Sequence, residues 1–219
     1  MKKNKKIFLI DFDDVLFNTK KFREDMIMLF SKFGVTREVF YETYKDFPVK
    51  HRNNKLEIYD PEKQFRKIKK QFNLDTEKLK KEFYKLVFHS HKYVFSDVKK
   101  FLEKFKDEKL YIISYGKNNL QRLKIMYSGI DDCFQKIIIT NESKEEAVPI
   151  LFKNRKIEKR EIFFFDDRAR FVDGIKKKYP SIKTFLVKRK EGRYDDKKTK
   201  FCDFEIKTLG EAEKIIMKK

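Results

Sequence analysis

Five short apolar runs limit the folds that are open to this chain. They are almost continuously apolar rather than alternating, which is typical of parallel strands covered on both faces. The runs lie at Lys6–Phe12, Leu110–Ser114, Lys136–Thr140, Ile162–Phe165 and Lys183–Val187. From about Ser96 onward they alternate with helical patterns. We therefore expect an α/β fold, with a Rossmann-like parallel sheet flanked by helices and joined by right-handed crossovers.

Two of the expected helices have recognisable starts. Ser143 followed by Glu146, and Thr208 followed by Glu211, have the spacing of a capping box, in which each side chain binds a free backbone N–H of the first turn. They predict one helix that runs to about Lys153 and one last helix at the carboxyl end of the chain.

One segment breaks the alternation of strands and helices. Between about Lys20 and Tyr93 the sequence shows amphipathic helical patterns and no strand run. The expected helices cover about Phe22–Phe33 and Glu38–Tyr44, with one more opened by Asp60-Pro61 and one opened near Asp75. We therefore predict an α/β core of residues 1–19 and 94–219, interrupted by an all-helical cap at residues 20–93.

The chain is strongly basic. It has 55 Lys and Arg residues against 35 Asp and Glu residues, a formal charge of +20 over 219 residues, which is suited to attract nucleic acid, anionic lipid or phosphorylated metabolites. Part of the excess is local, because Lys176 to Lys200 holds eleven basic and three acidic residues. Two interpretations stay open for that stretch, a solvated basic face and a site for a polyanion.

Targeting signals and cysteine pairs are not evident. The apolar run after the basic start is interrupted at Asp11, too early for a signal peptide or a membrane span, so we expect a cytoplasmic protein without membrane contact. Cys133 and Cys202 lack the spacing of metal ligands, and we expect no disulfide between them. His89 and His91 are expected to be surface residues.

Polar residues follow the expected strands at the points where they end. In a parallel α/β sheet, ligands bind beyond these carboxyl ends. The residues are Asp11 and Asp13, Ser114, Lys144 at the start of a capped helix, and the pair Asp166-Asp167. Four carboxylates at one edge would repel one another unless a cation lay between them. Because Mg2+ prefers oxygen ligands and is commonly held by carboxylates and substrate phosphate, the set predicts Mg2+ and a phosphate.

The spacing of Asp11 and Asp13 suits a two-step transfer. Residues two apart on a strand point to the same side, so one carboxylate can attack phosphorus while the other handles a proton. A carboxylate nucleophile divides hydrolysis into the formation and the breakdown of an aspartyl-phosphate. Ser114 is suited to bind a phosphoryl oxygen and Lys144 to neutralise its charge. Lys136 is an alternative to Lys144, which is favoured by its place at a helix start.

This arrangement resembles the haloacid dehalogenase superfamily of phosphatases and phosphotransferases. DFDDV from Asp11 matches its first motif, IIS ending at Ser114 the second, Lys144 the third, and Asp166-Asp167 the acidic fourth. An insertion directly after the first motif resembles the common helical cap of that family.

The resemblance also implies a role for each residue. Asp11 would be the nucleophile and Asp13 the general acid and base, while Ser114 and Lys144 would bind phosphate. Mg2+ would be bound by Asp11, by the main-chain carbonyl of Asp13 and by Asp166. Asp167 would lie in the outer shell of the metal or serve as an alternative ligand.

Two positions depart from the family pattern. Asp14 stands where many members have glycine, and Val15 stands where many have threonine. Neither change removes a catalytic group. The presence of Asp13 argues against dehalogenation, because a departing halide needs no proton donor.

The sequence therefore predicts a Mg2+-dependent phosphatase that acts on a small phosphorylated metabolite. Two alternatives stay open: a polynucleotide-end phosphatase or nucleic-acid-binding protein, and a receiver-like module that accepts a phosphoryl group on an aspartate. No glycine-rich motif for a nucleotide cofactor is present. The candidates for substrate contacts in the insertion are His51, Arg52, Asn53 and Asn54.

Overall fold

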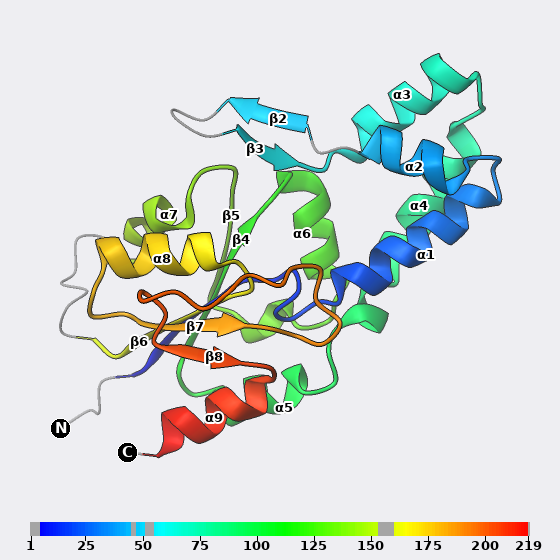
Figure 1. Ribbon diagram of the computed structural model, residues 1–219. Coiled ribbons are helices and arrows are strands. Elements are labelled where there is room, and N and C mark those ends of the chain that lie inside the picture. Colours follow the sequence, from blue (N-terminus) through cyan, green and yellow to red (C-terminus); the bar gives the residue numbers. More distant parts are fainter. Residues whose placement is uncertain (1–4, 45–46, 51–54, 153–159, 219) are drawn as a thin grey trace.

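The computed structural model (Figure 1) describes residues 5–44, 47–50, 55–152 and 160–218. The candidates at residues 51–54 lie outside this range. Within the described part of the chain, no helix is both long enough and apolar enough to cross a membrane. The side chains of Cys133 and Cys202 are free thiols, and both His89 and His91 are exposed, as predicted.

A six-stranded sheet forms the centre of the protein, and all of its strand pairs are parallel. Its strand order is β5-β4-β1-β6-β7-β8. The strands are β1 (Ile7–Ile10), β4 (Lys109–Tyr115), β5 (Lys136–Thr140), β6 (Ile162–Asp166), β7 (Lys183–Val187) and β8 (Phe204–Ile206). The prediction of an α/β fold with a parallel sheet is confirmed, and each of the five predicted runs is a strand. Only β8, at three residues, was too short to be recognised.

Helices cover both faces of this sheet, which explains the continuous apolar runs. On β1, Phe8 and Ile10 belong to the apolar cluster on the side of α5 (Val98–Lys104) and α9 (Leu209–Met217). Ile7 and Leu9 belong to the opposite cluster, with α7 (Lys144–Phe152) and α8 (Ala169–Lys178). Figure 1 shows these two helix pairs on opposite sides of the sheet. The helix α6 (Asn118–Met126) packs against β5 and against the insertion.

The two predicted helix starts are confirmed. The helix α7 begins at Lys144, directly after Ser143. At α9 the side chain of Thr208 accepts a hydrogen bond from the backbone N–H of Glu211 at 3.3 Å, which satisfies one of the free donors of the first turn.

The insertion between β1 and β4 is mostly helical. Its elements are α1 (Thr19–Ser31), α2 (Arg37–Tyr44), α3 (Pro61–Phe72), α4 (Glu77–Phe88) and the short 3-10 helix η1 (Ser90–Tyr93). As predicted, Asp60 caps α3, because its side chain accepts from the N–H groups of Glu62 and Lys63 at 3.1 and 3.3 Å. Asp75 accepts from the N–H of Glu77 at the start of α4.

The expectation of an all-helical cap is wrong in one respect. Residues Phe47–Lys50 and Lys55–Ile58 form an antiparallel strand pair, β2 and β3. Each strand has only four residues and includes lysine, and one includes proline. Such a short, mixed segment does not show the apolar run or the long alternation that identifies a strand in a sequence.

Aromatic rings hold the insertion together. The ring centroids of Phe30 and Phe40 lie 5.1 Å apart, and those of Phe65 and Phe83 lie 5.5 Å apart. All four residues belong to the same apolar cluster as Phe8 of the central sheet. The insertion is therefore packed onto the core through these four phenylalanines.

Candidate active site

A tight loop after β1 brings the first acidic residues to the edge of the sheet. The backbone N–H groups of Leu16 and Phe17 both donate to the carbonyl of Phe12 at 2.9 Å, and the N–H of Asp14 donates to the carbonyl of Phe17 at 2.8 Å. The rings of Phe12 and Phe17 stack at 5.0 Å. Asp14 has a φ of 56°, in the left-handed region that favours glycine. The turn thus holds Asp14 in a backbone conformation that glycine adopts more easily.

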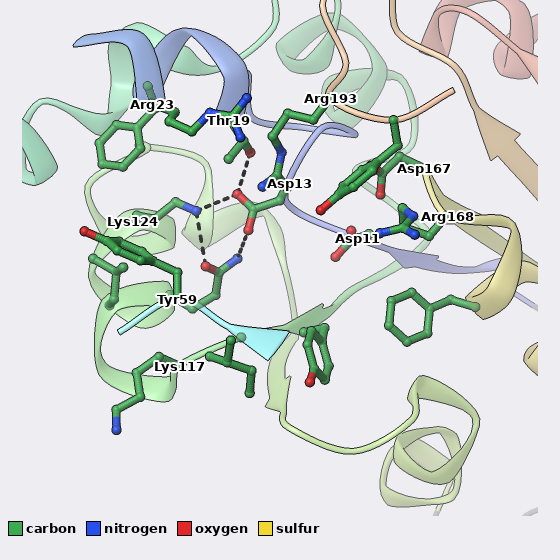
Figure 2. Close-up of a pocket in the computed structure, with 18 of the residues that line it drawn as sticks. Asp11, Asp13, Thr19, Arg23, Tyr59, Lys117, Lys124, Asp167, Arg168 and Arg193 are labelled. Carbon is green, nitrogen blue, oxygen red and sulfur yellow. Dashed lines mark hydrogen bonds and ion pairs between the residues drawn. The ribbon is translucent and has the colours of Figure 1, made fainter. Parts of the chain in front are cut away.

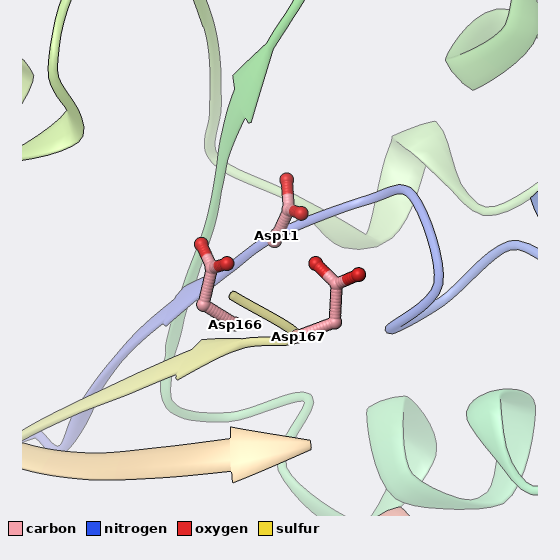
Figure 3. A group of neighbouring side chains, drawn as sticks. All are labelled: Asp11, Asp166 and Asp167. Atoms are coloured by element: carbon pink, nitrogen blue, oxygen red, sulfur yellow. The ribbon is translucent and has the colours of Figure 1, made fainter. Parts of the chain in front are cut away.

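Three carboxylates gather beside this loop (Figure 3). Asp11, Asp166 and Asp167 each offer an oxygen atom, and these oxygens all lie within 4.8 Å of one another. Asp166 ends β6, so the parallel pairing of β1 and β6 brings the two strand ends together. All three residues are buried. Among the described residues, this is the one group of three or more acidic, histidine or cysteine side chains with a geometry that suits a metal ion.

Lys144 lies within this cluster. Its Nζ is 2.7 Å from Asp11 Oδ1 and 2.6 Å from Asp166 Oδ2, and its side chain is completely buried. Lys136, the alternative from the sequence, is exposed and donates to the carbonyl of Ile150. The structure therefore brings Lys144, and not Lys136, to the carboxylates.

Asp13 lies in different surroundings (Figure 2). Its Oδ1 accepts from Thr19 Oγ1 at 2.7 Å and from Lys124 Nζ at 2.5 Å. Its Oδ2 accepts from Gln121 Nε2 at 2.7 Å. The same Gln121 nitrogen lies 2.7 Å from Ser114 Oγ, and Ser114 is buried at the end of β4. Gln121 therefore connects the predicted general acid to the predicted phosphate ligand.

The charges around these carboxylates shift their pKa values in opposite directions. Burial, together with the nearby charge of Asp166, raises the pKa of Asp11 to about 7 despite Lys144. Burial alone would also raise the pKa of Asp13, but Lys124 and Arg193 outweigh it and lower that pKa to about 2. Burial, Asp166 and Asp11 raise the pKa of Asp167 well above its usual range.

The acidic residues border a pocket between the core and the cap. Asp11, Asp13 and Asp167 line it from the core, and Arg193 and Tyr194 line it from the segment that connects β7 to β8. Helix α1, the rest of the insertion and α6 contribute Thr19, Phe22, Arg23, Met26, Tyr44, Ile58, Tyr59, Leu120, Gln121 and Lys124. The pocket thus presents carboxylates of the core and a wall from the insertion to the same space.

Sequence reasoning missed two site residues on α6, Gln121 and Lys124. Both are buried, and they share the buried face of that helix with Leu120 and Ile125. A lysine and a glutamine at helical spacing on an apolar face are a signal that the sequence does contain. Lys124 Nζ also lies 4.8 Å from the centre of the Phe17 ring.

Sequence reasoning also missed Arg193, in the basic stretch. Its Nε lies 2.5 Å from Asp14 Oδ2. The sequence pattern offered only a run of charges and no indication that one of them reaches the first loop.

The family model for haloacid dehalogenase-like hydrolases matches residues 8–185 of the chain. No curated protein matches this chain. Solved structures share the fold at low sequence identity. The L-2-haloacid dehalogenase of Xanthobacter autotrophicus is 13% identical, with a TM-score of 0.67 and 99% of each chain covered.

Two further solved structures share the fold. A protein of Bacillus subtilis assigned as a HAD-hydrolase and bound to magnesium is 14% identical, with a TM-score of 0.67, covering 98% of this chain and 100% of that one. A protein of Clostridium difficile assigned as a phosphatase is 18% identical, with a TM-score of 0.63, covering 99% of this chain and 100% of that one.

Proposed function

Because this chain belongs to the haloacid dehalogenase-like hydrolases, we propose that it hydrolyses small phosphate monoesters in a Mg2+-dependent reaction through an aspartyl-phosphate. The observation that carries the proposal is Asp13. It lies two residues after Asp11 in the same pocket, held by Thr19, Gln121 and Lys124. An ester oxygen leaves with a proton, whereas a halide leaves without one, so a positioned second carboxylate favours a phosphatase over a dehalogenase.

Each step has a residue to perform it. A carboxylate oxygen of Asp11 attacks phosphorus, the bond from phosphorus to the ester oxygen breaks, and Asp13 gives its proton to that oxygen. Asp13 then accepts a proton from water, whose oxygen attacks the phosphorus of the aspartyl-phosphate. This second step releases inorganic phosphate and restores Asp11.

Ser114 and Lys144 are the proposed ligands of the phosphoryl oxygens. Lys144 is adjacent to the nucleophile, at 2.7 Å from Asp11 Oδ1. The contact with Gln121 orients the Ser114 hydroxyl group. Charge that spreads over the phosphoryl group during transfer would be stabilised by these groups.

The acidic cluster fits a hard divalent cation. Its donors are carboxylate oxygens, and Asp167 Oδ2 is buried without a hydrogen-bond partner among the described residues. A buried carboxylate oxygen without a partner is costly, and a cation compensates for it. When bound there, Mg2+ would favour the ionised form of Asp11 and screen the charge of the transferring phosphoryl group.

Substrate binding would favour uptake of a proton from solvent by Asp13. With a pKa lowered to about 2, Asp13 is ionised in the free protein at neutral pH. A phosphate dianion next to it disfavours that ionised form and raises its pKa. Substrate binding therefore favours the protonated Asp13 that the first step needs.

The basic stretch supports a small substrate rather than a polyanion. Six of its cations have acidic partners within the chain: Lys176, Lys178, Lys183, Lys188, Arg189 and Arg193. Charges that are paired inside the molecule attract nucleic acid less than a free basic face does. We therefore keep the polynucleotide-end phosphatase as the weaker candidate.

Phosphate release tests the proposal. The protein should hydrolyse p-nitrophenyl phosphate and members of a panel of small monoesters when Mg2+ is present, and EDTA should abolish this activity. Asp11→Asn should abolish turnover, and Asp13→Asn should slow it by about 10² to 10⁴-fold.

Asp132→Asn is the matched control, because Asp132 is exposed and lies outside the pocket. Normal turnover by Asp11→Asn would contradict the mechanism. Halide release from 2-chloropropionate without any phosphatase activity would show that the dehalogenase alternative is correct.

A further inference from the structure

The segment that connects β7 to β8, residues 188–203 (here the β7–β8 strap), has no helix or strand but is firmly attached to the site. Arg189 donates to the carbonyl of Val15 at 2.8 and 3.2 Å and pairs with Asp97 at 2.7 Å. Asp196 accepts from the N–H of Ala169 at 2.9 Å and pairs with Arg168 at 3.1 Å. An irregular segment with this many charged contacts has a defined position, so its side chains can form part of a site.

Arg193 is the residue of this strap that pairs with the loop after β1, and it lines the pocket. Asp14, its partner, is completely buried, and Asp14 Oδ2 receives the Nε of Arg193 at 2.5 Å. This contact occupies the Nε side of the guanidinium and fixes its plane. The pair also gives Asp14 a role, since a buried carboxylate needs a cation.

The outer end of the guanidinium is free to bind a ligand. Among the described residues, no acceptor is bonded to either terminal nitrogen of Arg193, and the side chain is 18% exposed and lines the pocket with Asp11 and Asp13. Two terminal nitrogens in one plane form the fork that binds a carboxylate or phosphate through two parallel hydrogen bonds.

A second cation lines the same pocket from the cap. Arg23 of α1 has a buried Nε that lacks a hydrogen-bond partner among the described residues. Nor does Arg23 have an ion pair with a described acidic residue, unlike Lys117 and Lys124 in the same wall. A buried donor without an acceptor is costly unless a ligand supplies one.

The two arginines are not needed at the reacting phosphorus. The transferring phosphoryl group must contact Asp11, where Lys144 already supplies a positive charge. Arg193 pairs with Asp14, which follows Asp13 in the chain, and lines the pocket together with Asp13 (Figure 2). Because Asp13 must face the ester oxygen, a cation beside Asp13 is placed to meet the leaving group.

We infer that Arg193, oriented by Asp14 and assisted by Arg23, binds a second anionic group, a carboxylate or a phosphate, on the leaving group of the substrate. This inference rests on the proposed phosphatase function and narrows its substrate class to monoesters with two anionic groups. It assigns the specificity to the β7–β8 strap and to α1.

Three phosphonates of equal length test the inference, and their carbon–phosphorus bonds make binding independent of turnover. Propylphosphonate has an apolar end, 3-phosphonopropionate ends in a carboxylate, and 1,2-ethylenebisphosphonate ends in a second phosphonate. Calorimetric titration of the full chain with Mg2+ should show that one or both of the ligands with a second anionic end bind about 10- to 100-fold more tightly than propylphosphonate. The favoured ligand tells which anion the site takes.

Variants connect this preference to the arginines. Arg193→Gln alone leaves Asp14 buried without a partner, so the double variant Asp14→Gly/Arg193→Gln removes both charges and puts glycine at the left-handed position. In the double variant, the ratio of the affinity for the preferred anionic ligand to that for propylphosphonate should fall to about one. Arg23→Gln should lower this ratio partly. Lys190→Gln, an exposed neighbour in the strap, should keep the wild-type ratio.

Equal binding of all three ligands by the wild type, or an unchanged ratio in the double variant, would overturn the inference. Preference for the anionic ligands without hydrolysis of any monoester would instead contradict the proposed function and leave the anion site standing. Hydrolysis of monoesters without any preference for the anionic ligands would contradict the inference and leave the proposed phosphatase function standing.

Discussion

Asp11 and Asp13 are two residues apart in the chain, but their carboxylates experience opposite electrostatic surroundings. Asp11 shares a buried cluster with two other acids and one lysine, and its pKa is raised to about 7. Asp13 lies near the positive charges of Lys124 and Arg193 and accepts from the neutral donors Thr19 and Gln121, and its pKa is lowered to about 2. The comparison shows that the neighbours brought in by the fold, and not the D-x-D spacing, determine which carboxylate is ionised.

The largest expected effect comes from removing the positive charge of Lys144 from the acidic cluster. Lys144→Met leaves Asp11 and Asp166 buried without their lysine, so activity should be lost and the free energy of unfolding should fall by about 3 to 5 kcal/mol without Mg2+. Urea unfolding with and without Mg2+ measures the change. Lys136→Met, at an exposed lysine, is the control and should change it little. Equal stability of the two variants would show that Lys144 does not compensate for the cluster.

The sequence predicted the acidic cluster because its signals are local. Asp11, Ser114 and Asp166 end apolar runs, and parallel strands place such ends along one edge. Lys144 was identified by its position at a helix start. The fold and the cluster of Asp11, Asp166 and Lys144 were therefore predictable from patterns within single short segments of the sequence.

The surroundings of Asp13 were not predictable in this way. Lys124 comes from a helix face and Arg193 from an irregular segment, and each reaches the site over more than a hundred residues of chain separation. In a sequence with 55 basic residues, single charges of this kind cannot be told from solvated ones. The same applies to the β2–β3 pair, whose strands are too short for a pattern.

Removing the lysine beside Asp13 should sharpen the comparison. The lowered pKa of Asp13 stabilises the folded state above the unfolded pKa of 3.8, and this contribution is lost as the pH falls toward about 2. Lys124→Met should reduce the free energy of unfolding by about 2 kcal/mol at neutral pH, and much less below about pH 3. Chemical unfolding over this pH range is the measurement. A loss of equal size at every pH would mean that Lys124 acts through packing alone.

Mg2+ binding should depend on pH in the sense set by Asp11. The folded pKa of about 7 lies above the unfolded value of 3.8, so the metal-free protein loses stability as the pH rises between these values. A Mg2+ ion bound by Asp11 would displace that proton. Stabilisation by Mg2+ should therefore grow by about 1 kcal/mol per pH unit between about pH 5 and pH 7.

The measurement for this Mg2+ effect is the unfolding midpoint with Mg2+ and with EDTA. Asp132→Asn should show the same growth as the wild type, because Asp132 is exposed and lies outside the cluster. A Mg2+ effect that is independent of pH would mean that the ion does not compete with protons at the cluster.

The smallest expected effect comes from a neutral hydrogen-bond donor to Asp13, which can be compared with the charged donor Lys124. Thr19→Val removes the 2.7 Å hydrogen bond to Asp13 Oδ1 and should cost about 1 kcal/mol of stability. Thr43→Val in the cap removes a buried hydroxyl that donates to the carbonyl of Val39, and should cost a similar amount. Only Thr19→Val should also raise the pKa of Asp13, by less than Lys124→Met does, because the lysine charge acts more strongly than a neutral donor. Carboxyl titration by NMR compares the three variants, and an equal shift from Thr19→Val and Lys124→Met would mean that hydrogen bonding, not charge, distinguishes Asp13 from Asp11.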